Sequence, residues 1–212
     1  MKGLYVVIEG VDGTGKSTQA EMLNRALQYC GYPVKYVQEP GGESQFGQTL
    51  RALFKNHMAE LTPETQMYLI MAAKRELMAR EIAPALEKGQ VIIADRGLAS
   101  LYGYQHGRFG LPVGEIDEML TQASWLITPS VSFHLTLPVN ETLARIAARS
   151  DGSDDWDPAT VMEVESIAGG YETTRTRPEI WGDRHQTVDC ENLSRGAIHA
   201  RILRTVLNVL SE

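Results

Sequence analysis

Cysteine is scarce in this chain, which has 212 residues and only two cysteines, Cys30 and Cys190. They form no Cys-x-x-Cys pair and belong to no cluster of cysteine and histidine. Disulfide frameworks and structural zinc sites need several such residues at short, regular spacings. The sequence therefore predicts neither kind of cross-link, and a reducing cytoplasm is the expected compartment.

Positive charge and long apolar runs are also lacking. The formal net charge is −7, whereas proteins that bind nucleic-acid backbones usually carry a basic face. No segment approaches the ~18 apolar residues of a membrane-spanning helix. The apolar run at the amino terminus is short and leads into glycines, unlike a secretory signal. We therefore expect neither a nucleic-acid polymer nor a membrane as partner, and any phosphate must be bound by a local group of residues.

Repeats and long linkers are missing too, so one domain over residues 1–212 is expected, with the acidic stretch Ser150–Trp156 as a mobile loop. Short apolar runs alternate with helix-like segments, which predicts a parallel α/β sheet covered by helices. Strands are expected at Leu4–Ile8, Val34–Val37, Val91–Ala94, Val131–Leu137 and Thr187–Val188. Helices are expected through Ala20, Leu23 and Leu27, and at Pro63–Lys88 with a break near Pro84, Ile116–Ile127, Val139–Ala148, Pro158–Arg175 and Ser194–Leu210.

The strongest pattern is Gly10-Val-Asp-Gly-Thr-Gly-Lys16-Ser17, a P-loop (G-x-x-x-x-G-K-[ST]) between a predicted strand and a predicted helix. Its glycines let backbone amides turn toward phosphate oxygens, and the helix adds the positive end of its dipole. Lys16 is expected to bridge the terminal phosphates of ATP, and the Ser17 hydroxyl to bind Mg²⁺. A carboxylate beside phosphates is unfavourable unless it has a task, so Asp12 is a further candidate. The predicted ATP-binding residues are Gly10, Val11, Asp12, Gly13, Thr14, Gly15, Lys16, Ser17 and Thr18.

Further polar residues follow the second and third predicted strands, at the sheet edge where the P-loop also lies. Glu39-Pro40-Gly41-Gly42 is either part of a site or only a turn. Arg51, in a helix-like stretch, is either a surface charge or an anion clamp. Asp95 and Arg96 end the third strand. Asp95 can serve Mg²⁺ and Arg96 a phosphate, or the two form a structural ion pair.

Together these segments resemble the thymidylate kinase family of nucleoside monophosphate kinases. The resemblance covers nearly the whole chain and also includes Ser100, Gly103-Tyr104-Gln105, Thr136-Leu137, Arg145, Arg149, Tyr171 and Val188-Asp189. It implies a P-loop NTPase core with a parallel five-stranded sheet flanked by helices. It also implies a short lid at about residues 145–160, ATP and Mg²⁺ as cofactors, and a homodimer.

The resemblance implies roles for individual residues as well. Asp12 orients the acceptor, Arg51 and Arg96 hold its phosphate, and Glu39 and Asp95 organise the Mg²⁺ and acceptor region. Tyr104 packs against the sugar and disfavours a ribose 2′-hydroxyl, while Gln105 lies where the family contacts the base. One branch of the family has a basic residue where this chain has Gly13, so the lid must supply that charge through Arg149 or, as second candidate, Arg145.

The predicted catalytic residues are Asp12, Lys16, Arg96, Arg149 and Arg145, and the metal ligands are Ser17 and Asp95. The predicted acceptor-binding residues are Glu39, Pro40, Arg51, Ile70, Lys74, Arg75, Asp95, Arg96, Ser100, Leu101, Tyr104 and Gln105.

Three departures from the family pattern fall together on the acceptor base. Ile70 replaces a base-stacking phenylalanine, and Leu101 replaces a polar residue. Lys74 replaces a base-reading arginine, although Arg75 stands next to it. In a fourth departure, the acidic stretch at 150–157 replaces an Asp-Arg pair of the lid. The first three changes remove an aromatic face, a bidentate fork and a polar contact.

Two interpretations of the acceptor pocket follow. Either a divergent dTMP kinase rebuilds the pocket from nearby groups, or the base preference has changed toward dUMP, 5-hydroxymethyl-dUMP or a broader set of deoxynucleotides. The predicted reaction is in-line transfer of the γ-phosphoryl group to the acceptor 5′-phosphate. An uncharged nucleoside acceptor would leave Arg51 and Arg96 without a phosphate. A nucleotide-sensing module is the alternative from another class, and the chain lacks the guanine-reading Asn-Lys-x-Asp of GTPases.

Overall fold

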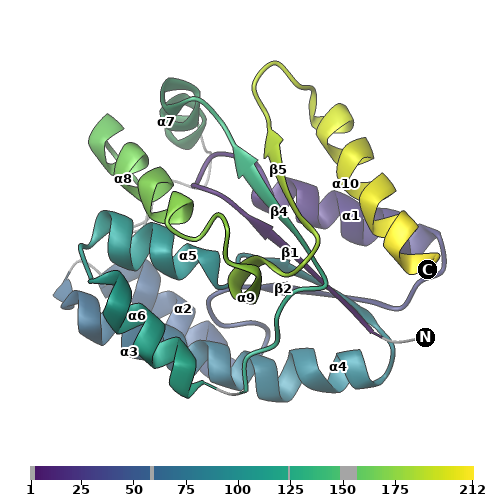
Figure 1. Cartoon of the computed structure of the whole chain (residues 1–212), viewed down its shortest axis with the longest axis horizontal. Coiled ribbons are helices and arrows are strands. Elements are labelled where there is room, and N and C mark those ends of the chain that lie inside the picture. The colour runs from purple at the N-terminus through teal and green to yellow at the C-terminus, as the bar shows by residue number, and fades with distance from the viewer. Residues whose placement is uncertain (1–2, 58–59, 124, 149–156) are drawn as a thin grey trace.

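Five parallel strands form the centre of the protein (Figure 1). The computed structural model describes residues 3–57, 60–123, 125–148 and 157–212. The strands are β1 (Leu4–Glu9), β2 (Val34–Gln38), β3 (Val91–Asp95), β4 (Val131–Thr136) and β5 (His185–Asp189). Their order is β2-β3-β1-β4-β5, and every paired neighbour runs parallel. The predicted fold class is confirmed, and each predicted strand is present.

Strand β1 is buried on both faces because its side chains alternate between two cores. Val6 and Ile8 pack in a cluster with α1 (Lys16–Tyr29) and α10 (Arg195–Leu210), and these two helices lie together on one face of the sheet (Figure 1). Tyr5 and Val7 point to the other face, where they pack in a second cluster. Burial on both sides holds β1 firmly, and with it the P-loop that follows at its carboxyl end.

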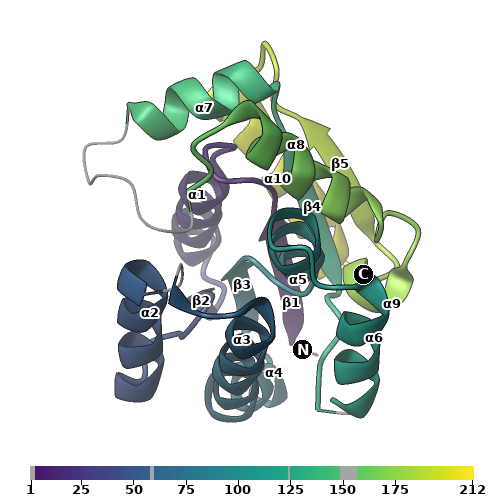
Figure 2. The same cartoon turned by 90° about the vertical axis from the view of Figure 1, so that its left-hand side faces the viewer.

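The remaining helices cover the opposite face and one end of the sheet. They are α2 (Gln45–His57), α3 (Pro63–Leu77), α4 (Ala83–Glu87), α5 (Ala99–Leu101), α6 (Val113–Gln122), α7 (Val139–Ala147), α8 (Val161–Glu172) and α9 (Pro178–Trp181). Figure 2 shows α7 and α8 together at one end of the molecule, away from α3 and α4. Among the helices described, none has the length and apolar composition needed to cross a membrane.

The long helix predicted over Pro63–Lys88 is divided into α3, a π-helical turn at Met78–Ile82, and α4. Thr62 begins it by accepting a hydrogen bond from the Thr65 N–H at 3.3 Å. Pro84 has no N–H, and its ring collides with the carbonyl four residues earlier, so the preceding turn widens. The predicted break at Pro84 is therefore confirmed.

A second π-helical segment, Tyr102–Arg108, follows α5 and packs closely against α8. Two glycines permit this approach. A Cβ atom on Gly107 would lie 2.2 Å from the Ser166 carbonyl oxygen, and one on Gly170 would lie 2.2 Å from that of Tyr102. Only a residue without a side chain fits at such distances, so α8 is held directly against the segment that carries Tyr104 and Gln105.

Two predicted helices have wrong bounds. The helix expected at Ile116–Ile127 begins at Val113 and ends at Gln122. Ala123 then leaves the helical conformation, and Trp125 and Ile127 pack against the core cluster around Tyr5 and Val7 instead of continuing a helical face. The helix expected at Pro158–Arg175 is limited to Val161–Glu172, since Thr160 and Glu163 form a capping box at its start.

Buried His134 on β4 is expected to make the stability of the protein sensitive to acid. Its ring stacks on Tyr171 at 4.8 Å between ring centres and lies 5.3 Å from Trp181. Burial, with a smaller effect of His185, lowers the pKa of His134 to about 4. Because the folded-state pKa lies below the ordinary value, the stabilisation is complete above about pH 6.5 and is lost as the pH falls toward 4.

We predict that His134→Phe reduces this loss of stability in acid. Between pH 8 and pH 5 the free energy of unfolding of the wild type should fall by about 2 kcal/mol more than that of the variant. Denaturant unfolding at the two pH values measures the difference, and the phenyl ring keeps the contacts with Tyr171 and Trp181. An equal loss in both proteins would contradict the assignment to His134.

Candidate active site

A cleft of about 790 Å³ opens at the carboxyl edge of the sheet. Segments far apart in the sequence meet there, because parallel strands place the loops that follow them at one edge. The predicted site residues that line it are Asp12, Gly13, Thr14, Gly15, Lys16, Ser17, Thr18, Glu39, Pro40, Arg51, Ile70, Lys74, Asp95, Arg96, Ser100, Leu101, Tyr104, Gln105 and Arg145. Gly10 and Val11 are buried behind the loop and are not part of its lining.

The P-loop forms one wall of the cleft, between β1 and α1. Gly15 precedes α1 in a left-handed conformation with φ of 97°, which glycine adopts without strain. Lys16 is buried, and its Nζ donates to the Val11 carbonyl oxygen at 3.0 Å and to Asp12 Oδ1 at 3.4 Å. The loop thus holds a buried ammonium group beside inward-turned backbone, which is the arrangement that binds polyphosphate.

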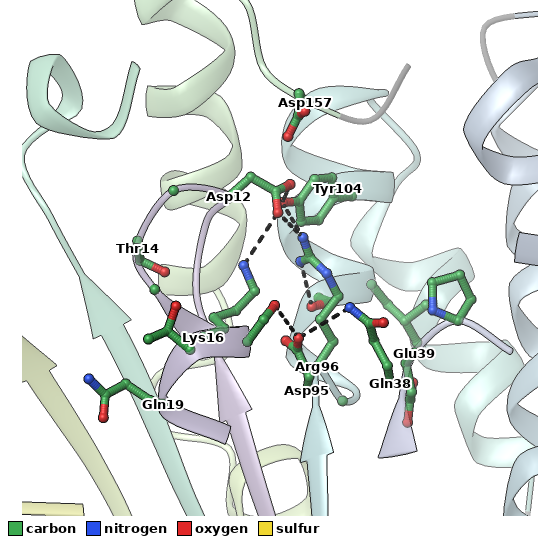
Figure 3. A pocket seen from close by; sticks show the side chains of 18 of the residues that line it. Asp12, Thr14, Lys16, Gln19, Gln38, Glu39, Asp95, Arg96, Tyr104 and Asp157 are labelled. Atoms are coloured by element: carbon green, nitrogen blue, oxygen red, sulfur yellow. Dashed lines mark hydrogen bonds and ion pairs between the residues drawn. The ribbon is translucent and has the colours of Figure 1, made fainter. Parts of the chain in front are cut away.

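Asp12, Arg96 and Tyr104 form a connected group that Lys16 joins through Asp12 (Figure 3). The Arg96 guanidinium donates to Asp12 and, at 3.1 Å, to the Tyr104 hydroxyl, which itself donates to Asp12 Oδ2 at 2.5 Å. Burial raises the pKa of Tyr104 above its ordinary value, so its hydroxyl remains a donor. Arg96 has a positive φ of 82°, a strained conformation for a residue with a long side chain. The group fixes a guanidinium in the cleft where it can meet an anion.

Ser17 and Asp95 supply a corner of oxygen ligands beside the P-loop. The Ser17 hydroxyl donates to Asp95 Oδ2 at 2.5 Å, and the Gln38 amide approaches the same oxygen at 3.4 Å. The other carboxylate oxygen, Oδ1, is buried and has no hydrogen-bond partner. Hydroxyl and carboxylate oxygens are what Mg²⁺ prefers, so this donor set fits the ion. No cluster of three or more acidic, histidine or cysteine ligands occurs in the described ranges, so phosphate and water oxygens would complete the coordination.

Glu39 and Lys74 form an ion pair buried within the cleft wall, with side chains 4% and 3% exposed. Lys74 Nζ also donates to the Gly97 carbonyl oxygen at 3.0 Å. Burial raises the pKa of Glu39, although Lys74 opposes this shift. Lys74 was expected to read the acceptor base, but its ammonium group is held between Glu39 and Gly97.

The part of the cleft where the resemblance implies the acceptor base is mostly apolar. Phe54, Ile70 and Leu101 line it, together with the amide of Gln105.

Arg75 does not line the cleft, so the expectation that it could replace the family's arginine needs correction. Its side chain is exposed, and the guanidinium lies 5.5 Å from the centre of the Trp125 ring. One residue along a helix is a turn of about 100°, which points Arg75 away when Lys74 points inward.

Glu9, the last residue of β1, connects several parts of the site and was absent from the predicted site residues. It is 1% exposed. Its Oε1 accepts from the Gly97 and Ser100 N–H groups at 2.8 and 3.1 Å, and its Oε2 from the Ser100 and Tyr171 hydroxyls at 2.6 and 3.2 Å. This carboxylate therefore fixes the turn after Arg96 and joins it to α8. One feature of the sequence could have identified Glu9 as a site residue: it is an acidic residue at the end of an otherwise apolar strand, directly before the P-loop.

The far end of the cleft was only partly predicted. Arg145 of α7 lines it and pairs with Glu141 at 3.5 Å on the helix surface. Arg149 and the acidic stretch Ser150–Trp156 lie outside the described residues. Asp157 lines the cleft, as do residues for which no motif gave a signal: Gln19, Leu193, Arg195 and Ile198. The last three follow β5, which ends at the same sheet edge.

Positive side chains gather at this cleft although the chain as a whole is acidic. Arg51, Arg145 and Arg195 line it in addition to Lys16 and Arg96, while the net charge of the chain is −7. With Lys74 these six cations outnumber the four carboxylates of the lining, Asp12, Glu39, Asp95 and Asp157, and an excess of positive charge attracts anionic ligands. The arrangement suits two phosphorylated ligands, one at the P-loop and one at Arg96.

Comparisons with known proteins agree with this arrangement. A family model described as thymidylate kinase matches residues 8–163. The chain is similar to the thymidylate kinase of Roseiflexus sp. (strain RS-1), with 31% identity over 92% of each chain. It is also similar to that of Pelotomaculum thermopropionicum, with 28% identity over 99% of this chain and 95% of the relative. A solved structure of thymidylate kinase from Ehrlichia chaffeensis has the same fold, with a TM-score of 0.72 and 21% identity over 98% of this chain and 99% of that one.

Proposed function

The chain belongs to the thymidylate kinase family, and from this premise we propose that it transfers the γ-phosphoryl group of ATP to dTMP, forming ADP and dTDP. The observation that carries the proposal is the cleft in which Lys16 of the P-loop and Arg96 lie together, both bonded to Asp12 (Figure 3). Two cations anchored beside each other on one carboxylate can hold a donor and an acceptor phosphate in reach of each other. Positioning of this kind supplies most of the catalysis in phosphoryl transfer.

In the proposed reaction an oxygen of the acceptor 5′-phosphate attacks the γ-phosphorus of ATP, and the bond from that phosphorus to the β-phosphate oxygen breaks. The acceptor phosphate is already ionised at neutral pH, since its second pKa is about 6, so no general base is required. Lys16 neutralises charge on the donor phosphates, and Arg96, assisted by Arg51, holds the acceptor phosphate. Asp12 keeps the Arg96 guanidinium in place through their ion pair.

Mg²⁺ bound at Ser17 and Asp95 would neutralise phosphate charge and orient the transferred group. The support for this assignment is the buried Asp95 Oδ1 without a hydrogen-bond partner beside the Ser17 hydroxyl. Ser17 lies at the first turn of α1, so its hydroxyl and the P-loop amides face the same phosphates.

A deoxynucleotide acceptor is favoured by Tyr104, which is buried beside Arg96 and occupies the space next to the acceptor phosphate site. An apolar base end lined by Phe54, Ile70 and Leu101 suits the 5-methyl group of thymine. The same apolar surface also accepts other 5-substituted deoxyuridylates. A changed base preference is therefore the second candidate, and it keeps the same chemistry.

The proposal predicts acceptor-dependent ADP formation. With ATP and Mg²⁺, dTMP should raise the rate of ADP release about tenfold or more above the rate without acceptor, because water is a poor substitute for a positioned phosphate. The acceptors to compare are dTMP, dUMP, 5-hydroxymethyl-dUMP, dCMP, dGMP, dAMP and UMP. Removal of Mg²⁺ with EDTA should stop the reaction.

Each outcome of this assay decides between the candidates. A clear preference for dTMP supports the first proposal, and preference for another monophosphate supports the changed pocket. ADP release that is independent of every acceptor would refute the kinase proposal and favour a nucleotide-sensing module.

A further inference from the structure

Two buried glutamines from different elements meet behind the acceptor-base end of the cleft. Gln66 of α3 is 2% exposed, and Gln105 of the π-helical segment is fully buried. Gln105 Nε2 donates to Gln66 Oε1 at 2.9 Å. Gln66 Nε2 in turn donates to the backbone carbonyl oxygen of Leu61 at 3.2 Å.

The chain of hydrogen bonds determines how both amides are oriented. A backbone carbonyl oxygen can only accept, so Leu61 requires the nitrogen of the Gln66 amide on its side. The Gln66 oxygen then faces Gln105 and requires the nitrogen of that amide. The orientation of Gln105 is thus fixed from Leu61 through Gln66, without any contact between Leu61 and Gln105.

In this orientation the Gln105 amide nitrogen is bonded to Gln66, and the amide oxygen is left to accept a hydrogen bond from a ligand. Gln105 lines the cleft, and its Oε1 is buried without a hydrogen-bond partner. Its neighbours in the lining, Ile70 and Leu101, have no polar side-chain atoms. Lys74, the nearby cation, is held by Glu39 and Gly97. A ligand that donates a hydrogen bond to this buried oxygen should bind more tightly. A ligand that cannot donate leaves the oxygen without a partner and should bind more weakly.

We propose that Gln66 is a specificity-determining positioning residue that makes the pocket select pyrimidines with an N–H at position 3. This inference rests on the proposed function and identifies how its acceptor is chosen. Thymine and uracil donate from N3, whereas cytosine presents a lone pair there. To donate to cytosine, Gln105 would have to turn its amide and set its oxygen against that of Gln66. Gln66 cannot turn in response because its own oxygen would then face the Leu61 carbonyl.

The first test uses the wild-type enzyme and needs no variant. The values of kcat/KM are compared for dTMP, dUMP, dCMP and N3-methyl-dTMP. We expect dTMP and dUMP to exceed dCMP, and N3-methylation to lower kcat/KM about a hundredfold. If dCMP or N3-methyl-dTMP matches dTMP, the inference is overturned while the kinase proposal stands. If no monophosphate is phosphorylated, the proposed function itself fails.

The second test asks whether the selection depends on Gln66. Gln66→Met removes the group that orients Gln105, so the preference for dTMP over dCMP should fall about tenfold, with more change in KM than in kcat. Exposed Gln122, substituted Gln122→Met, provides the matched control.

A double variant separates positioning from general damage to the pocket. Gln105→Leu removes the proposed acceptor and should also reduce the preference for dTMP. Adding Gln66→Met to Gln105→Leu should then leave the preference unchanged, because Gln66 acts through Gln105. Independent, additive losses from the two substitutions would refute the positioning role, as would an unaltered preference in Gln66→Met.

Discussion

Lys16→Met is expected to lower kcat by about three orders of magnitude. The Lys16 ammonium group lies inside the P-loop, within hydrogen-bond distance of Val11 and Asp12. A phosphoryl group in transfer carries negative charge on several oxygens, and a fixed cation stabilises that charge without having to reorganise. Methionine has a similar length but no charge, so the loss is electrostatic. Steady-state ADP release with saturating ATP and dTMP measures it.

The folded state should tolerate this substitution. Burial, and next to it the Arg96 guanidinium, lower the pKa of Lys16, which means that the charged form is disfavoured where it sits. We therefore expect Lys16→Met to unfold at a temperature no lower than the wild type. Lys88→Met, at an exposed position outside the cleft, is the control and should retain normal kcat. More than about a tenth of the wild-type kcat in Lys16→Met would contradict the role of this residue in transfer.

Breaking the Glu39–Lys74 pair is expected to produce the largest loss of stability. Lys74→Met should lower the free energy of unfolding by about 3–5 kcal/mol, because it leaves a buried carboxylate without its cation. Glu39 Oε1 already has no hydrogen-bond partner, so the remaining charge has little compensation. Denaturant unfolding at pH 7 measures the effect.

Two comparisons show whether the uncompensated charge is the cause. The double variant Glu39→Gln with Lys74→Met should recover most of the loss, since neither charge remains. Arg80→Met breaks an exposed pair with Glu76 and should lower the free energy of unfolding by no more than about 0.5 kcal/mol.

Burial already raises the pKa of Glu39. A group with a raised pKa favours folding at low pH, so the deficit of Lys74→Met should shrink as the pH falls toward 5. A deficit equal in the single and double variants would refute this account.

The ion pair also changes how the departures at the acceptor base are understood. A lysine that replaces a base-reading arginine could be expected to make a weaker version of the same contact. Here it makes a different contact, with Glu39 and Gly97, and we propose that base recognition depends on Gln105 as oriented by Gln66. A Gln105 oxygen that accepts from N3 suits thymine and 5-substituted uracils alike, so the acceptor assay decides between the two interpretations of the pocket.

Local patterns in the sequence were sufficient for the sheet and for the P-loop wall of the cleft. The P-loop depends on glycines and a helix start within eight consecutive residues, Gly10 to Ser17, and the strands depend on runs of a few apolar side chains. Each of these features is stabilised by neighbours in the chain or by burial alone, so its signal is contained in the segment itself. The residues that end the strands then had to meet, because parallel strands share a carboxyl edge.

Tertiary structure decided the contacts between segments that are distant in sequence. Glu39 and Lys74 are 35 residues apart, Gln66 and Gln105 are 39 apart, and Glu9 and Tyr171 are 162 apart. No local sequence pattern predicts which buried polar groups will become hydrogen-bond or ion-pair partners, since that depends on how the helices pack against the sheet. The sequence alone therefore determined the P-loop, where we propose that phosphate binds, through short-range backbone geometry. The fold determined which side chains remain available to the acceptor base, because buried hydrogen-bonding groups take the partners that packing brings to them.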